Sequence, residues 1–287
     1  MGGGAHPFGL SAPGTKRTCV ADALWVLLAL LIPALVTGID PCTTGAQAAF
    51  DFAATAAMTA RTLDQRTYVT EQAKRSGGHE YWQQEMADDD LSNVDNLMRR
   101  LLGEVALREL KRNPALELGA RTGWGTERMR HYGWNSTGLE LVKKSAAFAK
   151  MKGRNVVIGD MHQLSQSACT QGFVFSRHSL EHSLDHRRVI REIARVLVRG
   201  GVAAIVIPIE PQNHHPLHTQ AFQNDCLLVR ALVESGLHVL STESMHSRMA
   251  PPVLERFLAS SSRHGYEQRV LAYKPTVGSA CAGTSEG

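Results

Sequence analysis

Residues 115–125 read ALELGARTGWG, a short apolar run broken by one glutamate and followed by three glycines within seven residues. Glycine lets a chain turn tightly and keeps Cβ atoms away from a ligand that lies against the backbone. In an open α/β sheet, nucleotide-like ligands lie at the first strand-to-helix turn. The stretch therefore predicts a strand at residues 115–118 that leads into a ligand-binding loop.

After Pro114 the sequence alternates between short apolar runs and helical patterns. The runs that predict strands are residues 115–118, 137–141, 155–159, 172–176, 202–208, 237–243 and 267–275. Helical periodicity is clearest at residues 185–197, and a further helix fits residues 220–234. Strand–helix alternation is typical of an α/β fold with a doubly wound, mostly parallel sheet. Such a sheet holds its ligand at the carboxyl ends of the strands.

A helical extension precedes this alternation. Residues 91–110 carry apolar side chains at helical spacing, which predicts one buried face. These side chains are Val94, Leu97, Leu101, Leu102, Val105, Ala106 and Leu110. The sequence thus predicts a stalk and N-terminal helices at residues 41–111, an α/β domain at residues 112–275, and a disordered tail at residues 276–287.

The first 40 residues read as a leader or a membrane anchor. From Ala23 to Val36 no charged or polar side chain occurs, and Lys16 and Arg17 precede the run. This length lies between a signal-peptide core and a full membrane span of about 20 residues. We expect residues 20–39 to form a single-pass anchor with a cytosolic N-terminus, placing the remainder in the secretory pathway. Cleavage after the small residues that follow Val36 is the alternative, giving a secreted or organellar protein.

Composition excludes some classes of function. The formal net charge is +4 with a pI near 8.9, and no long Lys/Arg run occurs, so no nucleic-acid partner is predicted. The five cysteines are widely spaced and include no Cys-x-x-Cys pair. We therefore expect neither a zinc ribbon nor a redox pair, and interpret the cysteines mostly as small apolar residues or idle thiols.

The glycine loop fits two classes of enzyme. Gly119, Gly123 and Gly125 have the GxxxGxG spacing that short-chain dehydrogenases use for NAD(P). Those enzymes also need a tyrosine with a lysine four residues later, so that the lysine lowers the pKa of the phenol. None of the five tyrosines in this chain has that lysine. An NAD(P)-dependent oxidoreductase of the short-chain type therefore stays as the alternative prediction.

The second interpretation accounts for more residues. Residues 117–123, ELGARTG, resemble motif I of class I S-adenosylmethionine-dependent methyltransferases, which is written (D/E)xGxGxG. Glu117, Gly119 and Gly123 match this pattern, whereas Arg121 stands in place of the middle glycine. The resemblance implies that the loop binds the cofactor, with Arg121 reaching the carboxylate of the cofactor. An arginine that instead fills the crevice would indicate a non-catalytic relative.

The later motifs of the family follow in order. Glu140, 17 residues after Gly123, ends the second predicted strand, where an acidic residue binds the ribose hydroxyls. Asp160 and Met161 end the third and resemble the step that binds adenine. Residues 173–201 resemble the fourth strand, the "LEH" turn, the next helix and the "LkpGG" run, although Gly172 replaces an acidic residue. The resemblance is closest to type 11 methyltransferases and implies a seven-stranded Rossmann-like sheet.

The predicted site follows from these matches. The cofactor-binding residues are Glu117, Gly119, Arg121, Gly123, Glu140, Asp160, Met161 and Ser176. The predicted catalytic residues are His178 and His182, which suit a general base because imidazole titrates near neutrality, and Glu181, which would orient one of them. His214, His215 and His218 form the run HHPLH, but no fixed helix or neighbouring cysteine supports a metal site there, and none is predicted.

The sequence therefore predicts an S-adenosylmethionine-dependent methyltransferase that acts on a small-molecule, lipid or glycan acceptor and contacts the membrane through residues 20–39. The oxidoreductase and a non-catalytic protein with the same fold are the alternatives. No motif in the N-terminal helices or in the stretch after residue 208 specifies the acceptor, and none specifies an oligomeric state.

Overall fold

A computed structural model describes the α/β part of the chain. The described residues are 87–209, 218, 222, 224–246, 266–277 and 281. Its elements are α4 (Ala87–Leu110), β1 (Ala115–Leu118), α5 (Trp124–His131), β2 (Ser136–Glu140), α6 (Lys143–Met151), β3 (Val156–Ile158), β4 (Gln171–Arg177), η2 (Leu180–His182), α7 (His186–Val196), β5 (Leu197–Ile209), α8 (Asp225–Glu234), β6 (His238–His246) and β7 (Tyr266–Tyr273).

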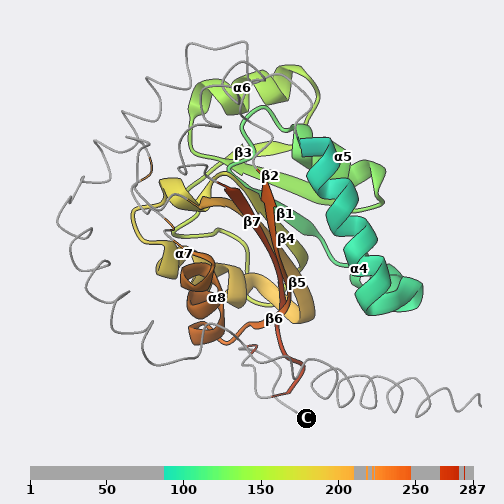
Figure 1. Ribbon diagram of the computed structural model, residues 1–287. Helices are drawn as coiled ribbons and strands as arrows, with labels where there is room; N and C mark the ends of the chain where they lie inside the picture. The colour runs from blue at the N-terminus through green and yellow to red at the C-terminus, as the bar shows by residue number, and fades with distance from the viewer. Residues whose placement is uncertain are drawn as a thin grey trace, which may run out of the picture. The chain divides into compact units, whose positions relative to one another are not determined.

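The seven strands form one sheet in the order β3-β2-β1-β4-β5-β7-β6 (Figure 1). The pairs from β3 to β5 are parallel, whereas β7 runs antiparallel to both β5 and β6. This confirms the predicted doubly wound, mostly parallel Rossmann-like sheet. The strand order reverses between β1 and β4, and an open α/β sheet binds its ligand at this point.

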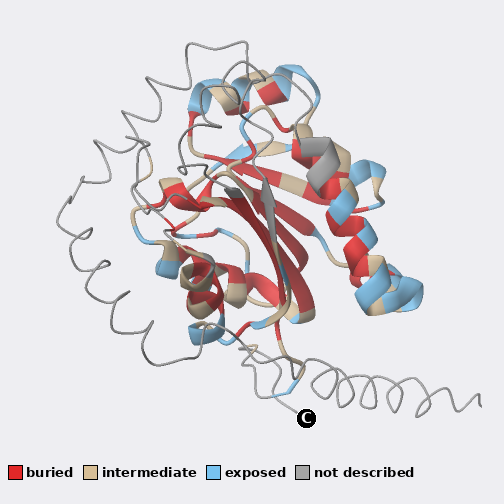
Figure 2. Cartoon of the chain, viewed as in Figure 1, coloured by how far each residue is buried: buried red, intermediate tan, exposed pale blue. Residues whose placement is uncertain are grey.

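Helices cover both faces of the sheet, so the central strands β1, β4 and β5 are largely buried between two apolar layers, whereas β3 at the edge is partly exposed (Figure 2). Side chains of α4 and α5 pack with Phe173, Phe175 and Val202 on one face. Side chains of α7 and α8 pack with Val174, Ile205 and other strand residues on the opposite face. The helix predicted at residues 185–197 is α7, whose apolar stripe reads Val189, Ile190, Ile193 and Val196.

The N-terminal helix differs from its prediction in one respect. Its first half buries Leu91, Val94 and Leu97 as the periodicity indicates. Gly103 then has non-helical backbone angles (φ 78°, ψ 161°) that interrupt the helix. The apolar face is no longer continuous across this break, and Val105, predicted to be buried, is 74% exposed.

One interpretation of the cysteines is wrong. Cys169 and Cys281 form a disulfide, with Cα atoms 5.8 Å apart. The two cysteines are 112 residues apart, so no local sequence pattern predicts that they pair. β7 supplies the physical reason, because it leads the chain back to the amino end of the sheet, where Cys169 precedes β4.

Several predictions fall on residues that the structure does not describe. These are the anchor at residues 20–39, most of the segment at residues 41–111, the first residues of the helix predicted at 220–234, and most of the tail. Among the described helices, none combines the length and apolar character that a membrane span requires.

Candidate active site

A crevice that is open to solvent lies at the carboxyl ends of β1 to β4, and water-sized molecules can occupy about 80 Å³ of it. Its lining combines residues from four separate loops. They are Gly119, Arg121, Leu139, Glu140, Leu141, Val142, Gly159, Asp160, Met161, His162, His178, Ser179 and His182. Seven of the eleven predicted site residues therefore meet in one place, although they span more than 60 residues of sequence.

The loop after β1 approaches the turn after β4 so closely that Gly119 cannot carry a side chain. Gly119 has φ of +68°, and a Cβ on it would lie 2.2 Å from Ser179 Oγ. The single proton of the Ser179 hydroxyl is shared between two acceptors, the carbonyl oxygens of Leu118 (2.9 Å) and Arg177 (3.0 Å). Gly123 also has a positive φ, of 78°, and caps α5. The glycines therefore shape the loop, as the opening stretch predicts.

Glu140 is buried at the end of β2, and backbone groups hold its carboxylate. One oxygen accepts from the Arg121 N–H and the other from the Val142 N–H, both at 2.7 Å. Burial raises the pKa of Glu140, and these two hydrogen bonds partly offset the increase. An ionised carboxylate has about four lone-pair sites, so the oxygens keep capacity for two ligand hydroxyls.

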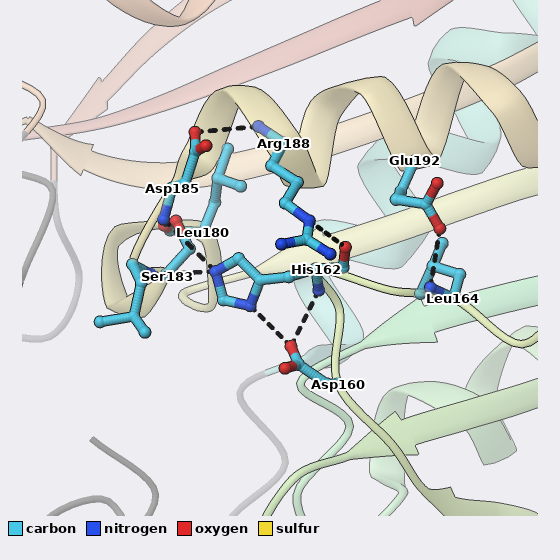
Figure 3. Close-up of polar contacts among 9 residues, drawn as sticks. Asp160, His162, Leu164, Leu180, Ser183, Asp185, Arg188 and Glu192 are labelled. Carbon is cyan, nitrogen blue, oxygen red and sulfur yellow. Dashed lines mark hydrogen bonds and ion pairs between the residues drawn. The ribbon is translucent and has the colours of Figure 1, made fainter. Parts of the chain in front are cut away.

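Asp160 follows β3, and hydrogen bonds from His162 hold its side chain (Figure 3). Its Oδ1 accepts from the His162 N–H at 2.9 Å and lies 2.6 Å from His162 Nδ1. His162 Nε2 accepts from the backbone N–H groups of Leu184 (3.0 Å) and Asp185 (3.3 Å). Because Nε2 accepts, Nδ1 carries the proton that His162 donates to Asp160. His162 thus ties the β3 tip to the start of α7.

The predicted catalytic residues lie in the turn after β4. His178 has a positive φ of 46° and lies between two carboxylates, with Nδ1 3.5 Å from Glu181 Oε1 and Nε2 2.9 Å from Glu267 Oε1. Burial acts to lower the pKa of His178, but the hydrogen bonds with Glu181 and Glu267 raise it to about 9. His178 therefore carries a proton at neutral pH. His182 also lines the crevice.

Four predicted residues lie outside the crevice lining. Ser176 is buried in β4, Glu181 is buried under the turn, and Gly123 is buried at the start of α5. Glu117 is buried behind the loop, where it accepts a hydrogen bond from the Thr126 hydroxyl. Burial raises the pKa of Glu117 to about 7, against the opposing effect of the Thr126 hydrogen bonds. Glu117 thus supports the loop from inside the domain.

The two departures from the family pattern have different consequences. Arg121 lines the crevice, and its backbone N–H already orients Glu140. Gly172 is required by packing, because a Cβ there would lie 2.5 Å from the Leu110 carbonyl oxygen at the end of α4. An acidic side chain has no room at this position while α4 packs there.

Sequence reasoning missed three residues of the site. Ser179 and His162 lie within the matched motifs, at positions next to predicted residues, but only the folded contacts give them partners. Glu267 lies in β7, 89 residues after His178, and no local pattern connects the two. Of the HHPLH run, only His218 is described, and its ring contacts that of His182 with centroids 4.8 Å apart.

The strand order and the position of the crevice define the fold as the Rossmann-like α/β fold of methyltransferases. Residues 116–205 match the family model described as a methyltransferase domain, which covers β1 to the middle of β5. The matched segment contains all eleven predicted cofactor-binding and catalytic residues. This part of the chain is therefore similar to a methyltransferase domain.

One solved structure shares the fold at low sequence identity, and a second is less similar. A candidate sarcosine dimethylglycine methyltransferase from Galdieria sulphuraria is 18% identical, with a TM-score of 0.50 over 63% of this chain and 86% of that one. An S-adenosylmethionine-dependent methyltransferase from Mesorhizobium loti is 17% identical, with a TM-score of 0.46 over 56% and 91% of the two chains. No curated protein sequence matches this chain.

Proposed function

We propose that this protein is an S-adenosylmethionine-dependent methyltransferase that acts on a small-molecule, lipid or glycan acceptor. The observation that carries the proposal is the meeting of Gly119, Glu140 and Asp160 in one crevice at the strand-order reversal. The methyltransferase domain match at residues 116–205 supports it independently. The missing Tyr–Lys pair counts against the oxidoreductase alternative.

The residues of the crevice fit the cofactor. S-adenosylmethionine supplies a methyl group that its cationic sulfur already activates. Glu140 would accept from the ribose hydroxyls, and Asp160 would accept from the adenine amino group, with Met161 packing on the ring. The glycine loop leaves its backbone open for the methionine part. Alignment and exclusion of water are what such a site mainly contributes, worth up to ~7–11 kcal/mol.

The acceptor would lie at the histidine end of the crevice, beside His178 and His182. A protonated His178 is suited to donate a hydrogen bond or to hold an anionic group, because Glu181 and Glu267 stabilise its charge. His182 lines the crevice and is the more suitable of the two to receive a proton from an acceptor.

Binding of S-adenosylhomocysteine to the purified full chain tests the cofactor assignment. We expect nanomolar-to-micromolar affinity and no binding of NAD(P). Glu140→Ala should weaken the affinity about 10- to 100-fold, because one or two charge-assisted hydrogen bonds of about 1.5–3 kcal/mol are lost. Glu109→Ala, which removes a half-exposed carboxylate on α4 that pairs with Arg112, is the matched control.

Three results would decide against the assignment. Binding of NAD(P) in place of S-adenosylhomocysteine would favour the oxidoreductase. Binding of neither would favour the non-catalytic alternative, and an unchanged affinity in Glu140→Ala would remove the ribose role. A radiolabelled methyl-transfer screen on cell extract, split into lipid, glycan, protein and small-molecule fractions, then identifies the acceptor class.

We also propose that residues 20–39 anchor the chain in a membrane of the secretory pathway, with the methyltransferase domain on the lumenal side. The uninterrupted apolar run from Ala23 to Val36 supports this proposal, and so does the Cys169–Cys281 disulfide, since disulfides persist in oxidising compartments. The tagged chain should resist alkaline extraction from membranes and be protected from added protease. Release by alkali, or digestion in intact vesicles, would contradict the proposal.

A further inference from the structure

A cluster of potential metal ligands lies beside the crevice. Glu181, His182 and His218 each offer one ligand atom, and these atoms all lie within 4.8 Å of one another. Glu181 and His182 belong to η2, whereas His218 belongs to the segment between β5 and α8. His182 also lines the crevice. The cluster therefore brings His218 to the wall of the crevice.

The carboxylate of this cluster is buried. Glu181 is 1% exposed, whereas His182 and His218 are partly exposed. A buried carboxylate is costly unless positive charge compensates it. A divalent cation held by Glu181, His182 and His218 would supply such charge next to the carboxylate.

The donor set selects the kind of metal. Two imidazole nitrogens with one carboxylate oxygen suit Zn²⁺ and neighbouring transition metals, whereas Mg²⁺ and Ca²⁺ prefer oxygen ligands alone. Three protein ligands are typical of a catalytic zinc site, which keeps its fourth position for water or substrate. The contact of His178 Nδ1 with Glu181 Oε1, at 3.5 Å, would orient the ligating carboxylate.

The geometry needs a small adjustment to hold the ion. Tetrahedral zinc with bonds of about 2.1 Å places its ligand atoms about 3.4 Å apart. The ligand atoms of the cluster lie within 4.8 Å. His182 and His218 are only half-buried, and their rings meet edge to face at 71°, so rotation of the two imidazoles can close the remaining gap.

We propose that Glu181, His182 and His218 bind one divalent transition-metal ion, with zinc the best match, at the acceptor end of the crevice. The role of the ion rests on the proposed function: its open position would bind an acceptor hydroxyl and lower the pKa of that group, with the proton passing to bulk water. His182 then acts as a ligand rather than as a general base. The sequence alone does not predict the site, because His218 follows His182 by 36 residues.

Metal titration of the chelator-treated full chain tests the site. Calorimetry should show one Zn²⁺ bound per chain, and Co²⁺ should give the visible absorption of a cobalt–imidazole complex. Glu181→Gln and His218→Ala should each weaken zinc binding at least about 10- to 100-fold, the range that loss of even an indirect support costs. If Glu181→Gln does not fold, His218→Ala carries the test, since its half-buried side chain is a less demanding position.

Two control variants separate this site from other histidines. The double variant His214→Ala/His215→Ala removes the remaining histidines of the HHPLH run, and His238→Ala removes an exposed histidine of β6; neither should change zinc affinity. Absence of saturable zinc binding, or an equal loss in the double variant, would overturn the proposal.

S-adenosylhomocysteine binding, measured on the same metal-free sample, distinguishes the two proposals. Cofactor binding without zinc binding overturns the metal site and leaves the methyltransferase assignment in place. Zinc binding without cofactor binding does the reverse.

Discussion

Glu117 belongs to the glycine motif, but its buried side chain influences the stability of the fold and does not line the crevice. Its carboxyl group is buried, and burial raises its pKa to about 7 from an ordinary value of 4.5. A raised carboxyl pKa means that the folded state binds its proton more tightly than the unfolded state does. The unfolded chain therefore ionises first, and folding loses stability as the pH rises from about 4.5 to about 7.

Glu117→Gln should remove this loss, because glutamine is neutral and its carbonyl oxygen can still accept from Thr126. We expect the variant to gain stability relative to the wild type as the pH rises from 4.5 to 8, by up to about 3 kcal/mol. Urea unfolding at several pH values measures the difference. Glu104→Gln is an exposed replacement of the same kind, and it shows the effect of removing a surface carboxylate together with its ion pair to Arg99. A difference that is constant with pH would contradict the assignment of a raised pKa to Glu117.

His162 is the residue whose replacement should separate stability from cofactor binding. His162→Ala removes the Nε2 acceptor of the Leu184 and Asp185 N–H groups and the Nδ1 donor to Asp160. We expect a loss of about 1–3 kcal/mol in unfolding free energy together with weaker S-adenosylhomocysteine binding. His162→Asn keeps a donor for Asp160 but cannot reach Leu184, so it should lose stability while retaining more of the affinity. Equal affinities in the two variants would show that His162 does not position Asp160.

At the scale of elements, the loop after β1 and the turn after β4 meet at Gly119. In Gly119→Ala the Cβ would lie 2.2 Å from Ser179 Oγ, in addition to the cost of roughly 1–2 kcal/mol for a positive φ. Gly133→Ala is the matched control, because Gly133 has φ of +86° but open space around the added Cβ. Thermal unfolding should therefore show a larger loss in Gly119→Ala than in Gly133→Ala.

A second substitution tests whether Ser179 causes the difference. The double variant Gly119→Ala/Ser179→Gly should lose less stability than the sum of the two single losses, because the clashing side chain is gone. Strictly additive losses would mean that the loop and the turn do not depend on each other.

The elements also show how far sequence reasoning reaches. The strands and α7 were predictable because alternation and helical periodicity follow from local burial, and Glu140 and Asp160 follow from their places at strand ends. The break at Gly103 was not predictable, because the sequence does not indicate which backbone angles a glycine within a helical pattern will adopt. Glu267 and His218 were not predictable as site residues, since sheet pairing and loop packing bring them to His178 and His182 from distant parts of the chain.

At the scale of the whole molecule, the Cys169–Cys281 disulfide fastens the chain after β7 to the amino end of β4. Lys274 strengthens the same junction, since its Nζ donates to the Leu197 carbonyl oxygen at 3.0 Å and lies 3.2 Å from Cys169 Sγ. The last strand of the sheet is thereby held at the end opposite the crevice. The disulfide should therefore affect global stability rather than cofactor affinity.

The double variant Cys169→Ser/Cys281→Ser tests this expectation. A disulfide that closes a loop of 112 residues restricts the unfolded chain by on the order of 4 kcal/mol. For a domain of this size that loss corresponds to a decrease in Tm of about 10 °C. Substitution is preferable to a reducing agent, because Cys226 is also disulfide-bonded and would be reduced as well.

Each single variant should lose as much stability as the double variant, because either change breaks the same bond. The affinity for S-adenosylhomocysteine below the Tm should be unchanged. An unaltered Tm would show that breaking the disulfide does not increase the conformational entropy of the unfolded chain. A loss of cofactor affinity would show that the disulfide influences the crevice at the opposite end of the sheet.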